Sequence, residues 1–164
     1  MARKDRAAGG TPATDALVAA GVPFTALEYT HHDDATDYGA EVVRETGRDA
    51  EQVFKTLVVS TGRRDLAVGV VPVAGMLDLK AMAAALGVKK VEMAAPAVAE
   101  RSSGYVVGGV SPVGQRTPLP TVIDETAQLF DTIVVSGGKR GLQIELSPDD
   151  LADVTGASFA PIGR

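Results

Sequence analysis

The chain has 164 residues, with 16 Lys and Arg against 21 Asp and Glu, a net charge of −5 and no cysteine. This length indicates one domain, and the lack of Cys excludes disulfides, thiolate nucleophiles and Cys-ligated metal sites. No apolar run could span a membrane, and the acidic balance argues against a broad DNA- or RNA-binding surface, though not against holding a short nucleic-acid end. We expect a disordered basic tail, residues 1–10, on a cytoplasmic domain of residues 11–164, because the tail lacks a signal peptide's apolar stretch.

Three stretches in the first half of the chain have a helix-capping residue before them and glycine after them. Thr11, followed by proline, opens the first stretch, and Asp37 and Asp78 precede the other two. Between them lie apolar runs that are typical of buried strands. We therefore predict helices over residues 12–20, 40–46 and 79–87, and strands over residues 23–29, 53–61, 66–73 and 91–94.

The second half of the chain has shorter strands and a hairpin signal. The segment SGGKRG separates two apolar runs as a hairpin turn does, and Ser147 is expected to cap a short helix. Strands joined by hairpins, without regular strand–helix alternation, indicate an α+β fold with a curled, mostly antiparallel sheet. We predict strands over residues 105–110, 119–125, 132–136, 142–146 and 157–162, helices over 97–103 and 150–155, and a turn or short helix over 126–130.

Lys55 lies within an expected strand whose two faces are both apolar. Alternation of side chains places it on one face with Val53 and Leu57, and places Phe54 and Thr56 on the other. A charged ammonium in this setting is unfavourable unless something neutralises it. A lysine among apolar residues at a cleft commonly binds an anion. The structural alternative is a lysine that reaches solvent at a strand end or joins a buried ion pair.

Gly108 and Gly109 lack side chains where an expected strand ends. Such glycines let a ligand oxygen approach backbone N–H groups closely, which would suit an oxyanion or an ester carbonyl. A β-bulge with a tight turn is the structural alternative. Ser136, at the end of another expected strand, could point into a cleft of the same kind.

Two further clusters resemble known sites only superficially. Residues 136–141 lack the spacing of a phosphate-binding loop and precede a strand, so a hairpin with Lys139 and Arg140 at its tip is favoured. His31 and His32 precede two aspartates, but adjacent residues of a polar turn rarely converge on one ion, and the chain has no other histidine. We therefore predict no metal site and no cofactor. We also predict no Ser–His–Asp triad, because the sequence has no nucleophile elbow.

Several motifs occur together between residues 11 and 162: KTLV at 55–58, PVAG-x-LDLK at 72–80, GGVSP-x-G at 108–114 and SGGKRGL at 136–142. In this order they resemble the YbaK-type Cys-tRNA(Pro) deacylases, which are free-standing relatives of the editing insertion of bacterial prolyl-tRNA synthetase. Each motif alone would be unspecific, and their combination carries the resemblance.

The resemblance implies a small mixed, mostly antiparallel β-barrel of about six or seven strands surrounded by helices. It also implies a trans-editing deacylase that removes cysteine from mischarged Cys-tRNA(Pro), with Cys-tRNA(Cys) as a second candidate substrate. A second site is needed because an apolar pocket separates amino acids of similar size by only about 1–3 kcal/mol. The implied partners are the 3′ CCA end of proline tRNA and prolyl-tRNA synthetase.

The resemblance also assigns site residues. Lys55 matches the family's central lysine, expected to contact the tRNA 3′ terminus. Gly108, with Gly109, matches the loop that holds the aminoacyl carbonyl through backbone N–H groups. Tyr29 and Ser136 match positions that line the pocket.

Three further positions belong to the expected site or adjoin it. Thr56 adjoins the lysine and is assigned to substrate binding. Gln143 is assigned there too, although some members carry aspartate at this position, which leaves the role of a carboxylate open. Phe54 stands where a tyrosine is often found, so one hydroxyl is missing.

In the mechanism proposed for the family, the cysteine thiol of the substrate attacks its own ester carbonyl and releases tRNA and a cyclic thioester. This chemistry suits a sequence without Cys or a convincing triad, since the protein then supplies positioning and electrostatic stabilisation. Two alternatives stay open: a deacylase for Ala-tRNA(Pro) or another small amino acid, and a non-catalytic module that binds a tRNA end or a nucleotide.

Overall fold

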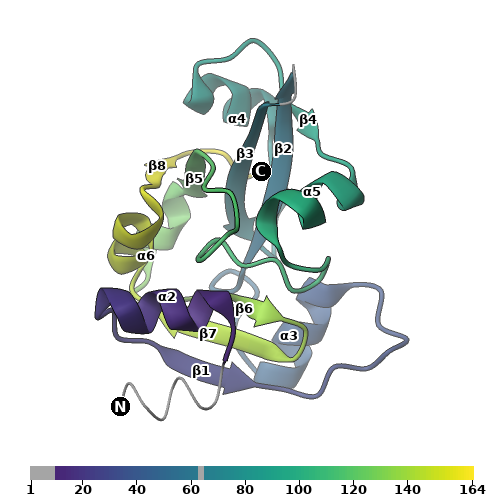
Figure 1. The fold of residues 1–164 in the computed structure, drawn as a ribbon, viewed down its shortest axis with the longest axis vertical. Coiled ribbons are helices and arrows are strands. Elements are labelled where there is room, and N and C mark those ends of the chain that lie inside the picture. Colours follow the sequence, from purple (N-terminus) through teal and green to yellow (C-terminus); the bar gives the residue numbers. More distant parts are fainter. Residues whose placement is uncertain (1–9, 63–64) are drawn as a thin grey trace.

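A computed structural model describes residues 10–62 and 65–164, so the predicted tail lies outside the described residues except for Gly10. Within this part of the chain, α-helices, one 3-10 helix and two sheets form an α+β fold (Figure 1). The helices are α2 (Pro12–Ala20), α3 (Tyr38–Thr46), α4 (Leu79–Leu86), α5 (Pro96–Ser103), η1 (Glu125–Leu129) and α6 (Pro148–Thr155). The strands are β1 (Thr25–Glu28), β2 (Phe54–Gly62), β3 (Asp65–Pro72), β4 (Glu92–Met93), β5 (Thr121–Asp124), β6 (Ile133–Lys139), β7 (Leu142–Leu146) and β8 (Ser158–Ala160).

The predicted helix caps are confirmed. Side chains of Thr11, Asp37, Asp78 and Ser147 each accept a hydrogen bond from a backbone N–H of the first turn that follows. Thr11 also donates through Oγ1 to the carbonyl of Gly137 at 2.5 Å. The start of α2 is therefore fixed against β6, next to the hairpin that joins β6 to β7.

Two sheets form where a closed barrel was expected. One has the order β1-β7-β6 and is antiparallel, and the other has the order β4-β2-β3-β5-β8, with β3–β5 and β5–β8 parallel. Figure 1 shows the smaller sheet in the lower part of the view and β2 and β3 rising above it. The sheets meet at a parallel bridge between Val53 and Val134, and among the described strands no further pairing closes a barrel, so that expectation is wrong.

Strand β3 separates two hydrophobic cores because both of its faces are buried, as the run of apolar residues predicts. Val68 and Val70 face the core that β6, β7, α2 and α6 cover. Ala67 and Val71 face a second core with Met82 of α4. This packing makes β2, the neighbour of β3, a rigid support for the residues that it carries.

The strand predicted over residues 105–110 is wrong. Gly109 N–H donates to the Val106 carbonyl at 2.8 Å, which closes a turn, and Gly108 has a φ of +87°. An extended strand cannot contain that φ. The segment is instead fixed by Tyr105, whose buried hydroxyl donates to the carbonyl of Val113 at 2.6 Å. In residues 10–62 and 65–164, no helix has the length and hydropathy of a membrane-crossing segment.

Candidate functional site

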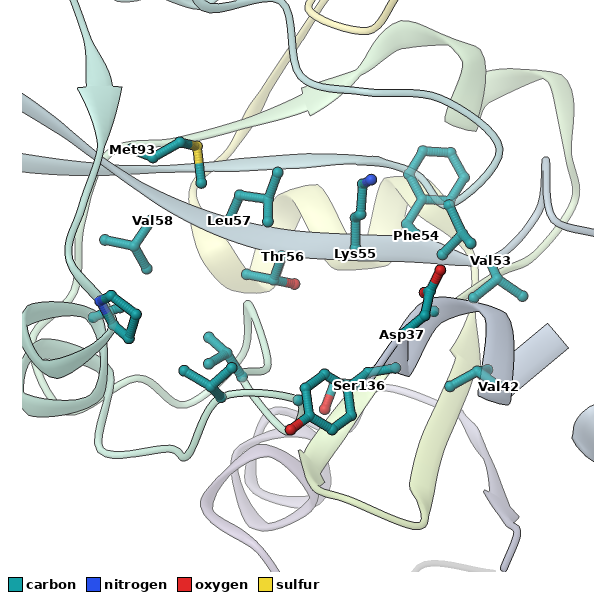
Figure 2. A pocket seen from close by; sticks show the side chains of 18 of the residues that line it. Asp37, Val42, Val53, Phe54, Lys55, Thr56, Leu57, Val58, Met93 and Ser136 are labelled. Atoms are coloured by element: carbon teal, nitrogen blue, oxygen red, sulfur yellow. The ribbon is translucent and has the colours of Figure 1, made fainter. Parts of the chain in front are cut away.

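A cavity of about 540 Å³ lies between β2, the start of α3, the turn that carries Gly108, and the β6–β7 hairpin. This volume lies in the range of small-ligand sites. Figure 2 shows side chains from β2 on one side of the cavity and Ser136 and the start of α3 on the other. The lining is mostly apolar, with a few polar groups supplied by different elements.

Lys55 lines this cavity from β2. Its side chain is half-buried, and among the described residues no carboxylate lies within ion-pair distance of its ammonium. Lys55 therefore forms no ion pair with a described residue, which excludes the buried ion pair within this part of the chain. An ammonium of this kind, next to an apolar surface, attracts an anionic group of a ligand.

Thr56 follows Lys55 on β2 and also lines the cavity. Its Oγ1 is buried and has no hydrogen-bond partner among the described residues. A buried hydroxyl without a partner is unusual, because leaving it unpaired costs about 1–3 kcal/mol. The group is therefore available to a ligand.

Gly108 also lines the cavity, and it lies at the centre of the turn closed by Gly109 N–H. No described carbonyl accepts a hydrogen bond from Gly108 N–H in the turn. A Cβ at this position would lie 2.8 Å from the ring of Tyr38, so glycine allows the ring to pack directly on the backbone. The turn thus offers one backbone donor beside the cavity, which is the group that binds a carbonyl oxygen in acyl-transfer sites.

Ser136 of β6 and Gln143 of β7 lie opposite each other in the antiparallel ladder, and both line the cavity. Ser136 Oγ accepts a hydrogen bond from Gly138 N–H at 3.2 Å. Gln143 is 3% exposed. Five of the expected site residues therefore meet at one cavity: Lys55, Thr56, Gly108, Ser136 and Gln143.

The structure does not bring Tyr29 or Gly109 to the described cavity lining. Tyr29 is half-buried at the end of β1, where it packs against the cluster of Val42, Val53 and Val134. Two of these valines line the cavity, so Tyr29 lies behind its wall. Gly109 uses its N–H within the turn and packs against the backbone of Lys139.

Sequence reasoning missed Tyr38 and Met93 as lining residues. Tyr38 is the first residue of α3, directly after the Asp37 cap, and its place beside a cap was the only local signal. Met93 lies on the short strand β4 and is 49% exposed, which is high for an apolar side chain in a fold with buried cores. It forms an apolar rim across the cavity from the start of α3 (Figure 2).

The histidines next to the site belong to a partly buried hydrogen-bond network around Glu41. His31 Nδ1 donates to Glu41 Oε1 at 2.7 Å, and the backbone N–H of His32 donates to Glu41 Oε2 at 2.9 Å. Burial raises the pKa of Glu41, but these hydrogen bonds and the nearby imidazoles outweigh it and hold the pKa below its usual value. Within the described residues no group of three potential ligands could hold a metal ion.

Comparison with known proteins decides the family. The model of the aminoacyl-tRNA editing domain matches residues 32–154. The chain belongs to this family. An Enterococcus faecalis protein named "Putative Cys-tRNA(Pro)/Cys-tRNA(Cys) deacylase EbsC" is 41% identical over 142 residues, which are 86% of this chain and 85% of that protein.

Two crystal structures share the fold of this editing-domain protein. One is described as "a putative trans-editing enzyme for prolyl tRNA synthetase"; it has a TM-score of 0.77, 25% identity, and coverage of 99% of this chain and 96% of that chain. The other, the hypothetical protein APE2540, has a TM-score of 0.81, 25% identity, and coverage of 93% of this chain and 99% of that chain. The chain therefore shares its overall fold with these two structures.

Proposed function

We propose that this editing-domain protein removes cysteine from mischarged Cys-tRNA(Pro) in trans, with Cys-tRNA(Cys) as a second substrate. One observation carries the proposal: a lysine ammonium without a described carboxylate partner and the Gly108 turn both line one largely apolar cavity. A cation for the nucleic-acid end and a backbone donor for the ester carbonyl are what an aminoacyl-tRNA terminus requires. The 41% identity with EbsC supports the choice of cysteine.

The five expected site residues that line the cavity each have a role in this proposal. Lys55 binds the anionic 3′ end of the tRNA, and Gly108 N–H donates to the ester carbonyl oxygen, where negative charge develops. Thr56 Oγ1, which has no hydrogen-bond partner among the described residues, forms a hydrogen bond with the substrate. Ser136 and Gln143 bind the polar groups of the ribose and the amino acid from the opposite sheet.

The substrate supplies the nucleophile. Its thiol sulfur attacks its own ester carbonyl carbon, a C–S bond forms, the C–O bond to the ribose breaks, and the thiol proton ends on the ribose oxygen. The products are tRNA and a cyclic thioester, which water opens to cysteine. In support, the chain has no Cys, and no basic side chain of the described residues is hydrogen-bonded to the hydroxyl of Thr56 or Ser136. Without such a base, a hydroxyl is a weak nucleophile.

The protein partner in this proposal is prolyl-tRNA synthetase. With 16 Lys and Arg against 21 Asp and Glu, the chain has no surplus of cations to hold the tRNA phosphates, so its own binding is confined to the CCA end. The synthetase would keep proline tRNA near the cavity. Tight binding of free tRNA by the isolated protein that resists added salt would contradict this part.

The deciding experiment is a deacylation panel with Cys-, Ala- and S-methyl-Cys-tRNA(Pro) and Cys-tRNA(Cys), each with and without the synthetase. We expect rapid release of cysteine and little release of S-methylcysteine, because the methyl group blocks the thiol. Equal or faster release of alanine would instead assign the protein to small amino acids in general. Binding of the tRNA end without turnover of any substrate would show a non-catalytic module.

A further inference from the structure

The turn that carries Gly108 can exist with its central peptide in two orientations. It runs from Val106 to Gly109, closed by their hydrogen bond, and its middle peptide joins Val107 to Gly108. The φ of +87° at Gly108 is that of a type II turn, whereas a type I turn has a negative φ there. The two types differ chiefly by rotation of the middle peptide, which exchanges the sides to which its C=O and N–H point.

Arg140, at the tip of the β6–β7 hairpin, holds this peptide. Its Nε and Nη2 both donate to the carbonyl oxygen of Val107, at 2.9 Å and 2.6 Å. Its guanidinium carbon lies 4.9 Å from the centre of the Tyr38 ring, and the same ring packs on Gly108. The two hydrogen bonds to Val107 and the contact with the Tyr38 ring thus fix the position of the planar guanidinium.

The direction of Gly108 N–H follows from this contact. In a trans peptide the C=O and N–H point to opposite sides. The Val107 carbonyl oxygen accepts from Arg140, which is not one of the described lining residues, whereas the two residues that the peptide joins, Val107 and Gly108, both line the cavity. With its carbonyl oxygen held by Arg140, the peptide directs its N–H away from the guanidinium.

We infer that Arg140 is a positioning residue for the reaction: it selects the peptide orientation in which Gly108 N–H faces the ester carbonyl. The positive charge at Val107 C=O also polarises the peptide and makes its N–H a stronger donor. The inference rests on the proposed function only for the identity of the bound carbonyl. The effect of Arg140 on the turn is independent of any substrate.

The rival role for Arg140 is direct binding of a tRNA phosphate, since its side chain is exposed. In that role Arg140 would act on affinity, whereas a positioning residue acts on the rate of the bound substrate. Lys139 provides a matched control. It is an exposed cation on the same hairpin, and its side chain forms no bond to Val107.

The kinetic test compares Arg140→Met and Lys139→Met with the unchanged protein on Cys-tRNA(Pro). We expect Arg140→Met to lower kcat about tenfold to hundredfold with little change in KM, since misplacement of a donor costs rate. Added guanidinium ion should restore part of the loss. Arg140→Lys should also lose rate, because an ammonium keeps the charge without the fork. A raised KM with unchanged kcat in Arg140→Met would overturn the inference in favour of phosphate binding.

A second readout does not depend on activity. The backbone amide resonance of Gly108, and its hydrogen exchange, should change in Arg140→Met and stay as they are in Lys139→Met. The unchanged protein could deacylate none of the substrates while the Gly108 amide still changes in Arg140→Met. In that case the proposed function fails and the positioning of the turn by Arg140 stands. An unaltered Gly108 amide in Arg140→Met would overturn the inference whatever the activity.

Discussion

Lys55 and Thr56 are consecutive residues of β2, and their side chains leave the strand on opposite faces, yet both line the same cavity (Figure 2). The reason is an open stretch on one edge of the strand. On that edge β2 meets β6 only at the bridge of Val53 with Val134, and it meets β4 only from Val58 onward. Between these contacts the cavity reaches around the strand edge to both faces.

The same open edge exposes backbone groups. Val53 C=O accepts from Val73 N–H on the β3 side, whereas Val58 C=O accepts from Ala94 N–H on the other side. Because these directions alternate along a strand, the N–H and C=O of Thr56 point to the open edge. Thr56 therefore presents three polar groups to the cavity, and Lys55 adds a charge from the other face.

Replacing Lys55 by Met should abolish most deacylation without unfolding the protein. The change removes the charge that binds the tRNA end and keeps the aliphatic stem, so we expect a loss of activity of about a hundredfold or more. Stability should stay the same or rise, because no described ion pair is lost and a half-buried charge is removed. Deacylation rates and thermal unfolding measure the two effects. Lys80→Met, at an exposed position of α4, is the control, and full activity in Lys55→Met would contradict the role.

Replacing Thr56 by Val should separate activity from stability. Valine has nearly the same shape as threonine, and the change removes only a hydroxyl that has no described partner. The free energy of unfolding should therefore stay the same or rise by up to about 1 kcal/mol. Deacylation should fall by about tenfold, the worth of one hydrogen bond to the substrate. Thr56→Ser, which keeps the hydroxyl, should retain most activity. A Val variant as active as Thr56→Ser would show that the hydroxyl does not bind substrate.

Replacing Gly108 by Ala should impair both the turn and the reaction. A side chain at positive φ costs about 1–2 kcal/mol, and the new Cβ would also lie 2.8 Å from the Tyr38 ring. Gly21→Ala is a matched control, because Gly21 has a φ of +70° and a Cβ added there would have no atom within 4 Å. Urea unfolding should show a larger loss for Gly108→Ala, and only this variant should lose deacylation. Equal losses of stability in both variants would mean that the ring accommodates the methyl group.

Local sequence signals were sufficient for the helices and for the position of Lys55. Thr11, Asp37 and Asp78 act as caps through bonds to backbone groups within three residues, so their signal is contained in a few letters. The alternation that placed Lys55 on a buried-type strand is equally local.

The errors have a common cause, which is contact between distant parts of the chain. The segment YVVGGV has the composition of a strand, but a turn fixed by Tyr105 and Val113 overrides it. The open edge of β2 depends on where its pairing with β4 and β6 ends, and no sequence motif indicates these end points. The bond from Arg140 to Val107 spans 33 positions, so the hairpin tip gave no sign of its role.

Glu41 offers a test of the network behind the cavity wall. It is 1% exposed, and both of its carboxylate oxygens accept hydrogen bonds from the 31–32 segment. Because its pKa is lower in the folded protein than in the unfolded chain, the ionised carboxylate stabilises the fold above the unfolded pKa. This contribution is lost as the pH falls through the folded pKa.

Glu41→Gln should therefore destabilise the protein in a pH-dependent way. At neutral pH we expect a loss of about 1.5–3 kcal/mol, the range for hydrogen bonds to charged groups. The difference from the unchanged protein should hold down to about pH 5 and shrink as the pH falls below about 4, because the unchanged protein then loses its own carboxylate. Glu45→Gln, on the same helix and 3.8 Å from His32, should change stability by less than about 0.5 kcal/mol. Urea unfolding at a series of pH values measures both variants. A difference for Glu41→Gln that stays constant to pH 3 would show that shape, and not charge, is what Glu41 contributes.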